Sequence, residues 1–150
     1  MKKITTAFIL IFIGLSLHAQ IIRNEGYQQQ LDEQYASGLF KGTLNSYMIV
    51  PADDPSSLGS LTIFHYLQGR IPGLMITTNW PYNTPTVRWR MGTPAYFLDE
   101  MRVDASVLSM ISINDIGLVK VFRPPFIGAI GGGAGGAIAV YTLRGDEEEE

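Results

Sequence analysis

Five of the six residues from 131 to 136 are glycine, and an alternating apolar run, Ala137 to Leu143, follows them directly. Glycine adopts backbone conformations that other residues avoid, and its lack of a side chain lets two chain segments approach closely. The cluster therefore predicts a tight turn that allows the chain to approach itself and to enter a buried strand.

The same cluster also satisfies the G-x-G-x-x-G spacing of a dinucleotide site, through Gly131, Gly133 and Gly136. Such a site needs a strand before the glycines and a helix after them, because the helix N-terminus receives the pyrophosphate. Here Pro124 and Pro125 precede the cluster and a strand-like run follows it, without the lysine of a P-loop. We therefore expect no nucleotide site and no cofactor.

The first residues have the form of a secretory leader. Lys2 and Lys3 precede a short apolar run, Ala7 to Leu17, and Ala19 offers a cleavage point before Gln20. A membrane-spanning helix needs about 20 apolar residues, and this run is about half as long. Residues 1–19 are therefore predicted to be a signal peptide, and the protein is expected to be exported.

The charge distribution argues against nucleic acid as a partner. Without Lys2 and Lys3 the chain carries 9 basic and 14 acidic residues, and five of the acids form the terminal run at 146–150. The remaining body is balanced and shows no basic footprint. We expect residues 146–150 to be a solvated acidic tail, because like charges repel one another. The absence of cysteine excludes disulfides and thiolate metal sites.

Residues 20–52 form a polar stretch that we interpret as an N-terminal arm whose order depends on a partner. Leu31, Tyr35 and Leu39 recur every four residues, which indicates one short amphipathic helix. Tyr47 to Val50 is strand-like and ends at Pro51.

The compact part is expected to span residues 53–145 and to begin with a helix over residues 55–68. Asp54 is suited to the N-cap and Pro55 to the first helical position. The apolar residues expected on one face of this helix recur at steps of three: Leu58, Leu61, Phe64 and Leu67.

Strand patterns dominate the rest, apart from a short helix that Asp104 can cap. The expected strands cover residues 74–77, 87–91, 95–98, 118–122 and 137–143. This order predicts an α+β fold, with a small mixed β-sheet, one main helix and one short helix.

No catalytic constellation is recognisable. His65 is the single histidine outside the leader, so a zinc site would need carboxylates around it, and no serine lies in a recognisable nucleophile motif. We expect a protein that is not an enzyme and that holds no metal.

Two arginines on one strand have the best case for function. Arg88 and Arg90 alternate with Trp89, so they are expected on one side of the strand. Ordinary solvation, with pairing to Asp99 or Glu100 on a neighbouring strand, accounts for them more simply. A partner or ligand surface formed by Arg88, Arg90, Asp99 and Glu100 is therefore a hypothesis.

Five segments, in order, resemble the plug domain of TonB-dependent receptors, especially the SusC-like branch that imports glycans and peptides. They are residues 66–74 (YLQGRIPGL), 87–92 (VRWRMG), 96–100 (YFLDE), 113–122 (INDIGLVKVF) and 128–142 (GAIGGGAGGAIAVYT). The corresponding family patterns are Q-G-R-x-x-G, I-R-G, V-D-G, D-I-x-x-I-x-V-L-K and a glycine-rich closing strand. The resemblance implies a plug-like fold over about 85 residues.

The chain departs from the family pattern in several respects. Glu100 stands where the family has glycine, and Met91 separates Arg90 from Gly92. No clear TonB box is present, since Tyr47 to Val50 is only a loose candidate. The chain also ends where a receptor would begin its barrel, so we expect a plug-like module without a barrel.

The resemblance implies a binding or gating module of the outer-membrane uptake system, located in the periplasm or at the periplasmic face of the outer membrane. An outer-membrane barrel or another envelope protein is the expected partner, and TonB is a further candidate. Two alternatives stay open: a free periplasmic binding or scaffold protein that reuses the plug fold, and a truncated remnant of a receptor.

Overall fold

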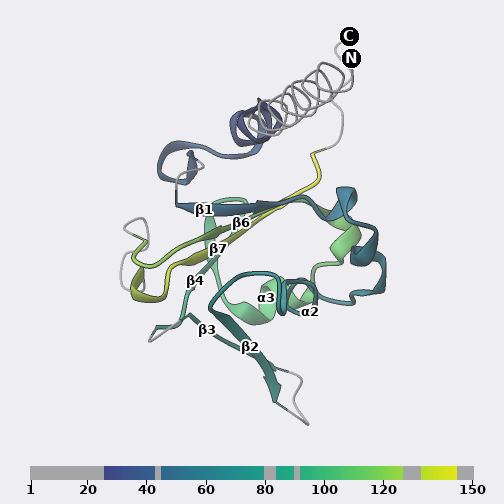
Figure 1. Ribbon diagram of the computed structural model, residues 1–150, viewed down its shortest axis with the longest axis vertical. Coiled ribbons are helices and arrows are strands. Elements are labelled where there is room, and N and C mark those ends of the chain that lie inside the picture. Colours follow the sequence, from purple (N-terminus) through teal and green to yellow (C-terminus); the bar gives the residue numbers. More distant parts are fainter. Residues whose placement is uncertain (1–25, 43–44, 80–83, 90–91, 127–132, 145–150) are drawn as a thin grey trace, which may run out of the picture.

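A computed structural model describes residues 26–42, 45–79, 84–89, 92–126 and 133–144. These residues form an α+β fold with a five-stranded sheet, a two-stranded sheet and short helices (Figure 1). The expected fold class is confirmed. The leader, the acidic tail, Arg90 and Gly131 lie outside the described residues.

The main sheet is mixed. Its strands are β1 (Ser46–Ile49), β4 (Ala95–Leu98), β5 (Met101–Val103), β6 (Ile116–Phe122) and β7 (Ala137–Thr142), in the spatial order β1-β6-β7-β4-β5. β4 and β7 run parallel, whereas the other neighbours are antiparallel. The strands expected at residues 95–98, 118–122 and 137–143 are therefore present, and β6 and β7 lie at the centre.

A separate antiparallel pair, β2 (Leu74–Asn79) and β3 (Thr84–Trp89), projects away from the main sheet (Figure 1). Two short helices, α2 (Ile63–Leu67) and α3 (Ala105–Met110), lie on the same side of the sheet as this pair. α3 begins directly after Asp104, as the sequence predicted.

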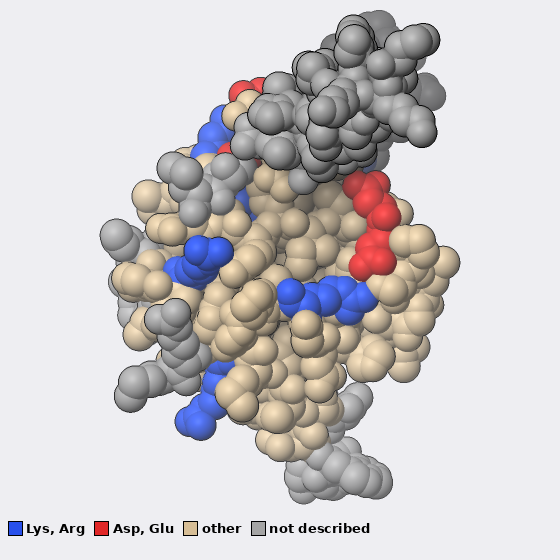
Figure 2. Space-filling model, in the orientation of Figure 1, with Lys and Arg blue, Asp and Glu red and all other residues tan. Residues whose placement is uncertain are grey.

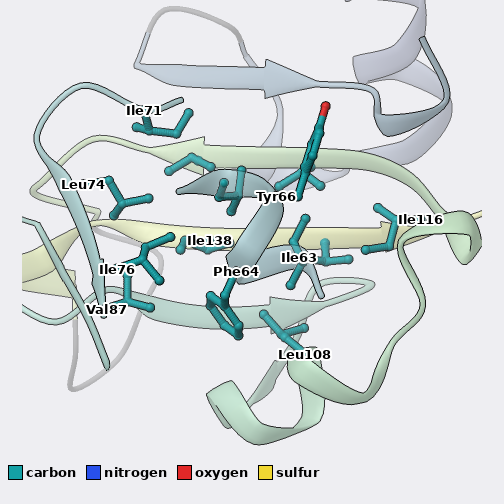
Figure 3. Packing of buried hydrophobic residues seen from close by; sticks show 14 of the residues in the cluster. Ile63, Phe64, Tyr66, Ile71, Leu74, Ile76, Val87, Leu108, Ile116 and Ile138 are labelled. Carbon is teal, nitrogen blue, oxygen red and sulfur yellow. The ribbon is translucent and has the colours of Figure 1, made fainter. Parts of the chain in front are cut away.

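The sheet is buried on both faces, because every residue of β6 is buried. Along β6, Val119 and Val121 point to one face, while Leu118 and Phe122 point to the other. The first face packs under α2, α3 and the β2–β3 pair and forms the larger hydrophobic cluster (Figure 3). Ile63, Tyr66, Leu67 and Leu108 of the two helices are fully buried in it.

The second face is covered by the stretch from 26 to 42, which we call the N-terminal segment. It contains a helix described from residue 26 to 35, and it buries Leu31, Tyr35 and Phe40 against the sheet. Leu39, expected on the same helical face, is 72% exposed because the helix has already ended. These residues of the expected N-terminal arm thus pack against the sheet within the described fold.

The strand-like run near Tyr47 also belongs to the folded body. β1 pairs with β6 in antiparallel register, with Tyr47 opposite Val121. β1 is thus an edge strand of the main sheet, although it lies before residues 53–145, the span expected for the compact part. Sequence patterns missed this because a four-residue strand of half-buried side chains carries little periodic signal.

The helix expected over residues 55–68 is present as two pieces. The Asp54 carboxylate accepts a hydrogen bond from the Ser56 amide and Pro55 takes the first position, as predicted, but this start is a 3₁₀ turn, Pro55–Gly59. Ser60 is extended, and Thr62 caps the separate helix α2. Leu58 and Leu61, expected to be buried, are 80% and 90% exposed in consequence.

The described glycines explain how the last strand enters the sheet. A Cβ on Gly135 would lie 2.3 Å from the carbonyl of Thr93, and one on Gly92 would lie 2.7 Å from Gly135. Gly136 has a φ of +81°, and a Cβ there would meet the Phe122 carbonyl at 2.3 Å. A strand, β7, follows directly, so the helix that a dinucleotide site requires is missing after these glycines.

Within the described part of the chain, no helix is long and apolar enough to cross a membrane.

Candidate functional site

Of the four residues singled out in the sequence, Arg88, Asp99 and Glu100 are described, and Arg88 lies in the β2–β3 pair whereas the two carboxylates lie in a turn of the main sheet. Arg88 is on the exposed face of β3 and Trp89 is buried on the other face, as the alternation predicted. However, β3 pairs with β2, where Arg88 lies opposite Met75. The carboxylates of Asp99 and Glu100 are engaged elsewhere in the fold, so pairing with Arg88 is not observed.

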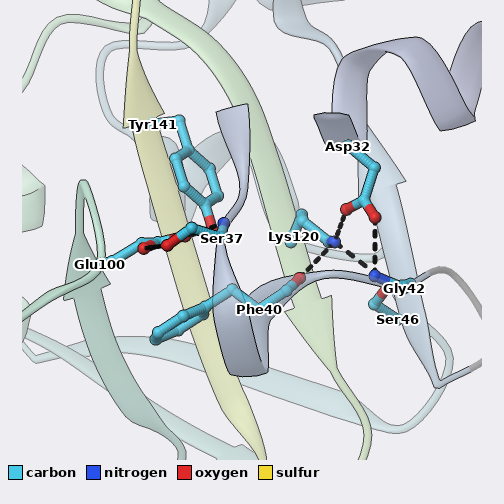
Figure 4. Close-up of polar contacts among 8 residues, drawn as sticks. All are labelled: Asp32, Ser37, Phe40, Gly42, Ser46, Glu100, Lys120 and Tyr141. Atoms are coloured by element: carbon cyan, nitrogen blue, oxygen red, sulfur yellow. Dashed lines mark hydrogen bonds and ion pairs between the residues drawn. The ribbon is translucent and has the colours of Figure 1, made fainter. Parts of the chain in front are cut away.

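Asp99 and Glu100 form the two-residue turn between β4 and β5, with φ values of 45° and 67°. Such left-handed conformations favour glycine, which is the residue that the family pattern has in place of Glu100. Both carboxylates are held: Asp99 accepts hydrogen bonds from the Thr142 amide and hydroxyl, each at 3.0 Å. Glu100 accepts from the Ser37 amide and hydroxyl and, at 3.4 Å, from the Tyr141 hydroxyl (Figure 4).

Glu100 therefore connects a turn of the main sheet to the N-terminal segment. The backbone conformation of Glu100 is unfavourable for a glutamate. The hydrogen bonds from Ser37 to its carboxylate offset this cost while the N-terminal segment is docked. Burial, and then the charge of Glu100, raises the pKa of the Tyr141 hydroxyl above its usual range. Tyr141 consequently stays neutral and donates to the carboxylate.

A second contact with the N-terminal segment is an ion pair beneath it. The Lys120 ammonium, on the centre strand β6, is fully buried and pairs with the Asp32 carboxylate (Figure 4). It also donates to the carbonyls of Phe40, at 2.6 Å, and Gly42, at 3.2 Å. The other carboxylate oxygen of Asp32 accepts from the Gly42 amide at 2.6 Å.

All described acceptors of this buried ammonium thus come from the N-terminal segment. A buried ammonium is strongly unfavourable unless it is paired and hydrogen-bonded. The docking of the N-terminal segment and the burial of Lys120 are therefore coupled.

Two further contacts fit the N-terminal segment to the sheet. Gly117 of β6 leaves room for the Tyr35 ring, since a Cβ there would lie 2.5 Å from the Tyr35 hydroxyl oxygen. Arg144, after β7, donates to the carbonyls of Gln34, at 2.6 Å, and Tyr35, at 3.4 Å. These contacts satisfy carbonyls at the end of the N-terminal helix, where such groups lack helical partners.

A surface cavity of about 340 Å³ opens where the N-terminal segment meets the β4–β5 turn. Its charged side chains are of both signs: Glu33, Lys41, Asp99, Glu100 and Arg144. Several of them are already engaged within the fold, as described above. The arrangement suits binding and the holding of a segment.

On the opposite side of the sheet, Asp54 organises a surface network. Hydrogen bonds from the Ser56 side chain and amide, and from the Tyr66 hydroxyl at 3.0 Å, lower the pKa of Asp54 to about 2. Burial and the Asp54 carboxylate raise the pKa of Tyr66 to about 12. Arg70, from the Q-G-R pattern, lies 3.5 Å from Asp54 and stacks over the Tyr66 ring, so this motif has a structural role here.

The rest of the surface shows no concentrated field. The face drawn in Figure 2 is mostly uncharged, with separated basic groups and a place where acidic and basic side chains meet. Among the described residues, no three His, Cys, Asp or Glu side chains gather in a way that could hold a metal ion.

Sequence reasoning missed Lys120 and Asp32 as a pair. A usable signal was present, because Lys120 interrupts an otherwise apolar seven-residue strand, IGLVKVF. A lysine in such a run requires an acceptor within reach. The sequence could not say which of the acidic residues supplies it, since Asp32 lies 88 positions away.

Similarity to known proteins is found in the three-dimensional structure and not in the sequence. No family model matches the chain, and no curated protein is significantly similar to it. Solved structures do match, with identities of 22% or less for those compared below.

A structure of the RagAB peptide importer in its closed-closed state matches with a TM-score of 0.55 and 22% identity over 72% of this chain. The siderophore receptor PirA from Acinetobacter baumannii matches with a TM-score of 0.53 and 20% identity over 68% of this chain. The ferric enterobactin receptor PfeA from Pseudomonas aeruginosa matches with a TM-score of 0.51 and 15% identity over 69%. The matched regions make up only 13%, 18% and 18% of those chains.

These proteins are TonB-dependent receptors and transporters, not enzymes. The resemblance of this chain to the plug domain of such receptors is therefore confirmed at the level of the fold, over about 70% of its length.

Proposed function

We propose that this protein is a non-enzymatic, plug-like binding or gating module of an outer-membrane TonB-dependent uptake system, acting with a separate barrel or other envelope protein. The observation that carries the proposal is the structural likeness to receptors over 72% of this chain, although it spans only 13% of the RagAB chain. Most of the RagAB chain has no counterpart in the matched region. Under this proposal, a barrel or another envelope protein is the partner.

The described surface supports a binding role. Several large apolar side chains are exposed to solvent. Leu58 and Leu61 are 80% and 90% exposed. Scattered exposed apolar residues are common, but these two lie three positions apart, Leu58 in the 3₁₀ turn and Leu61 in the break before α2. Under this proposal they contact the partner, together with the exposed face of β3 that carries Arg88.

The proposal places the exported protein in the periplasm or at the periplasmic face of the outer membrane. Arg88, Arg90, Asp99 and Glu100 remain the proposed partner or ligand surface, with Asp99 and Glu100 acting partly through the fold contacts described above. TonB is a further candidate partner. A free periplasmic binding or scaffold protein and a receptor remnant are the competing functions.

The test is an affinity purification of the tagged protein from detergent-solubilised outer membranes of the cells that make it, with partners identified by mass spectrometry. Recovery of a stoichiometric barrel protein supports the module. Recovery of the protein alone, from the soluble periplasmic fraction, overturns the gating role and favours the free binding protein. A Leu58→Ser, Leu61→Ser variant tests the contact surface, and it is expected to recover less of the partner than the wild type.

A further inference from the structure

A second cavity, of about 370 Å³, lies on another part of the surface and is independent of the proposed function. It is lined by Tyr47 of β1, by Pro72 and Gly73 in the turn before β2, by Trp89 at the end of β3, and by Arg123 and Pro124 after β6. Its volume falls at the lower end of the range of small-molecule sites. Elements from four separate parts of the chain therefore meet around it.

Two aromatic rings and one guanidinium form the wall. The rings of Tyr47 and Trp89 lie 6.2 Å apart at an angle of 33°. The Arg123 guanidinium stands over the Tyr47 ring, 4.8 Å from its centroid, and donates to the Tyr47 hydroxyl at 3.0 Å. Stacking and this hydrogen bond fix the guanidinium in one orientation.

The indole N–H of Trp89 has no acceptor among the described residues. Trp89 is only 3% exposed, yet no described residue accepts a hydrogen bond from its Nε1. Trp89 is one of the residues that line the cavity. A Cβ on Gly73 would lie 3.1 Å from Nε1, so the absence of a side chain at Gly73 leaves the approach open.

Arg123 has no ion-pair partner among the described residues either. The ion pairs found among the described residues join Arg70 to Asp54 and Lys120 to Asp32, and none includes Arg123. None of the described residues that line the cavity is acidic. A fixed cation and an unpartnered N–H thus face the same space.

We propose that this cavity binds a carboxylate, with its oxygens on the Arg123 guanidinium and the Trp89 indole N–H and its apolar part against Tyr47 and the two prolines. The planar guanidinium matches a carboxylate in two-point hydrogen bonding. A neutral polyol fits less well, because its hydroxyl groups need acceptors and the Tyr47 hydroxyl, the one side-chain acceptor in the lining, is engaged by Arg123. The carboxylate can belong to a free small acid or to the end of a peptide.

The test uses the ¹⁵N-labelled full chain and the indole N–H signal of Trp89 in a ¹⁵N–¹H correlation spectrum. The chain has two tryptophans, so a Trp80→Phe variant assigns the signal. The probes are benzoate and its neutral counterpart benzamide, and acetyl-Ala-Phe with a free or an amidated end. We expect a saturable shift of the Trp89 signal with benzoate or with the free-acid peptide, at millimolar concentrations or below, and none with the neutral counterparts.

Arg123→Gln should weaken the binding by about tenfold or more, because it removes a charge-assisted hydrogen bond. Arg88→Gln is the matched control, since Arg88 is an exposed arginine beside Trp89 whose side chain points to the other face of β3, and it should leave binding unchanged. If Arg123→Gln does not fold, Arg123→Lys provides the second variant and should also weaken binding.

The outcomes divide cleanly. A shift with benzoate alone assigns the site to small acids, and a shift with the free-acid peptide alone assigns it to peptide ends; both support the proposal. The proposal is overturned if neither acid shifts the Trp89 signal, if benzamide acts as strongly as benzoate, or if Arg88→Gln and Arg123→Gln weaken binding equally.

Discussion

The Lys120 ammonium at the centre of β6 is paired with the Asp32 carboxylate of the N-terminal helix, 88 positions earlier in the sequence. This pair joins the N-terminal segment, which the sequence did not predict to be part of the fold, to the inner strand β6. Because Lys120 is fully buried, its other acceptors, the carbonyls of Phe40 and Gly42, also depend on the docked N-terminal segment. The stability of the sheet is thereby coupled to residues 26–42.

Removing one member of the pair should be much more damaging than removing both. Asp32→Asn leaves a buried cation without its counter-charge, and we expect the free energy of unfolding to fall by about 3–5 kcal/mol. The double variant Asp32→Leu, Lys120→Met should stay within about 1–2 kcal/mol of the wild type, because apolar residues of similar size often replace buried pairs. Urea denaturation measures both. Equal losses in the two variants would show that the charge itself is unimportant.

The close approach of Tyr35 to Gly117 gives a second test of the docked segment. Gly117→Ala places a Cβ 2.5 Å from the Tyr35 hydroxyl, so we expect a loss of about 1–3 kcal/mol from overpacking. In a Tyr35→Leu background the same substitution should be nearly neutral, because the ring is gone. A double-mutant cycle measures the difference. Strictly additive effects would mean that the two residues do not meet.

Glu100 should act on the N-terminal segment and not on the sheet as a whole. Glu100→Gly relieves a left-handed backbone conformation but removes the acceptor of the Ser37 amide. We expect the global stability to change by less than about 1 kcal/mol, while the Ser37 amide exchanges faster in native-state hydrogen exchange. Glu33→Gln, an exposed carboxylate on the same segment, is the control and should leave this amide protected. Unchanged exchange at Ser37 in Glu100→Gly would refute the role.

Asp54 should govern part of the acid sensitivity. Hydrogen bonds in the folded state lower its pKa from the ordinary 3.8 to about 2, so its contribution to stability is present above pH 4 and is lost as the pH falls toward 2. Melting temperatures of the wild type and Asp54→Asn, recorded across this interval, should differ at neutral pH and converge at the acid end. A difference that stays constant through the interval would contradict the shifted pKa.

The sequence predicted the fold class and the positions of most strands because these depend on local patterns. β6 and β7 follow from apolar runs, whereas the three-residue strand β5, Met101–Val103, was not predicted. The break at Ser60 was not predictable, because the three-residue spacing of Leu58 and Leu61 fits a helix even though tertiary packing leaves both exposed.

The site was less predictable than the fold, because its key contacts join residues far apart. Lys120 was recognisable as unusual within its strand, but Asp32 lies in a polar stretch without distinctive spacing. Arg88 was placed correctly on the exposed face of β3. Its expected neighbours Asp99 and Glu100 lie in the β4–β5 turn of the main sheet, whereas β3 pairs with β2. Strand order cannot be read from alternation alone, and so the expected pairing failed.

The most direct test of the proposed module is site-specific photocrosslinking in the cells that make the protein. A photoreactive phenylalanine analogue is placed at Leu61 or Arg88, which are exposed, and at Tyr66, which is fully buried, as the control. The account predicts a crosslink from Leu61 or Arg88 to one outer-membrane protein, and none from Tyr66. The account is contradicted if neither exposed position crosslinks to an envelope protein and the protein is recovered from the periplasm.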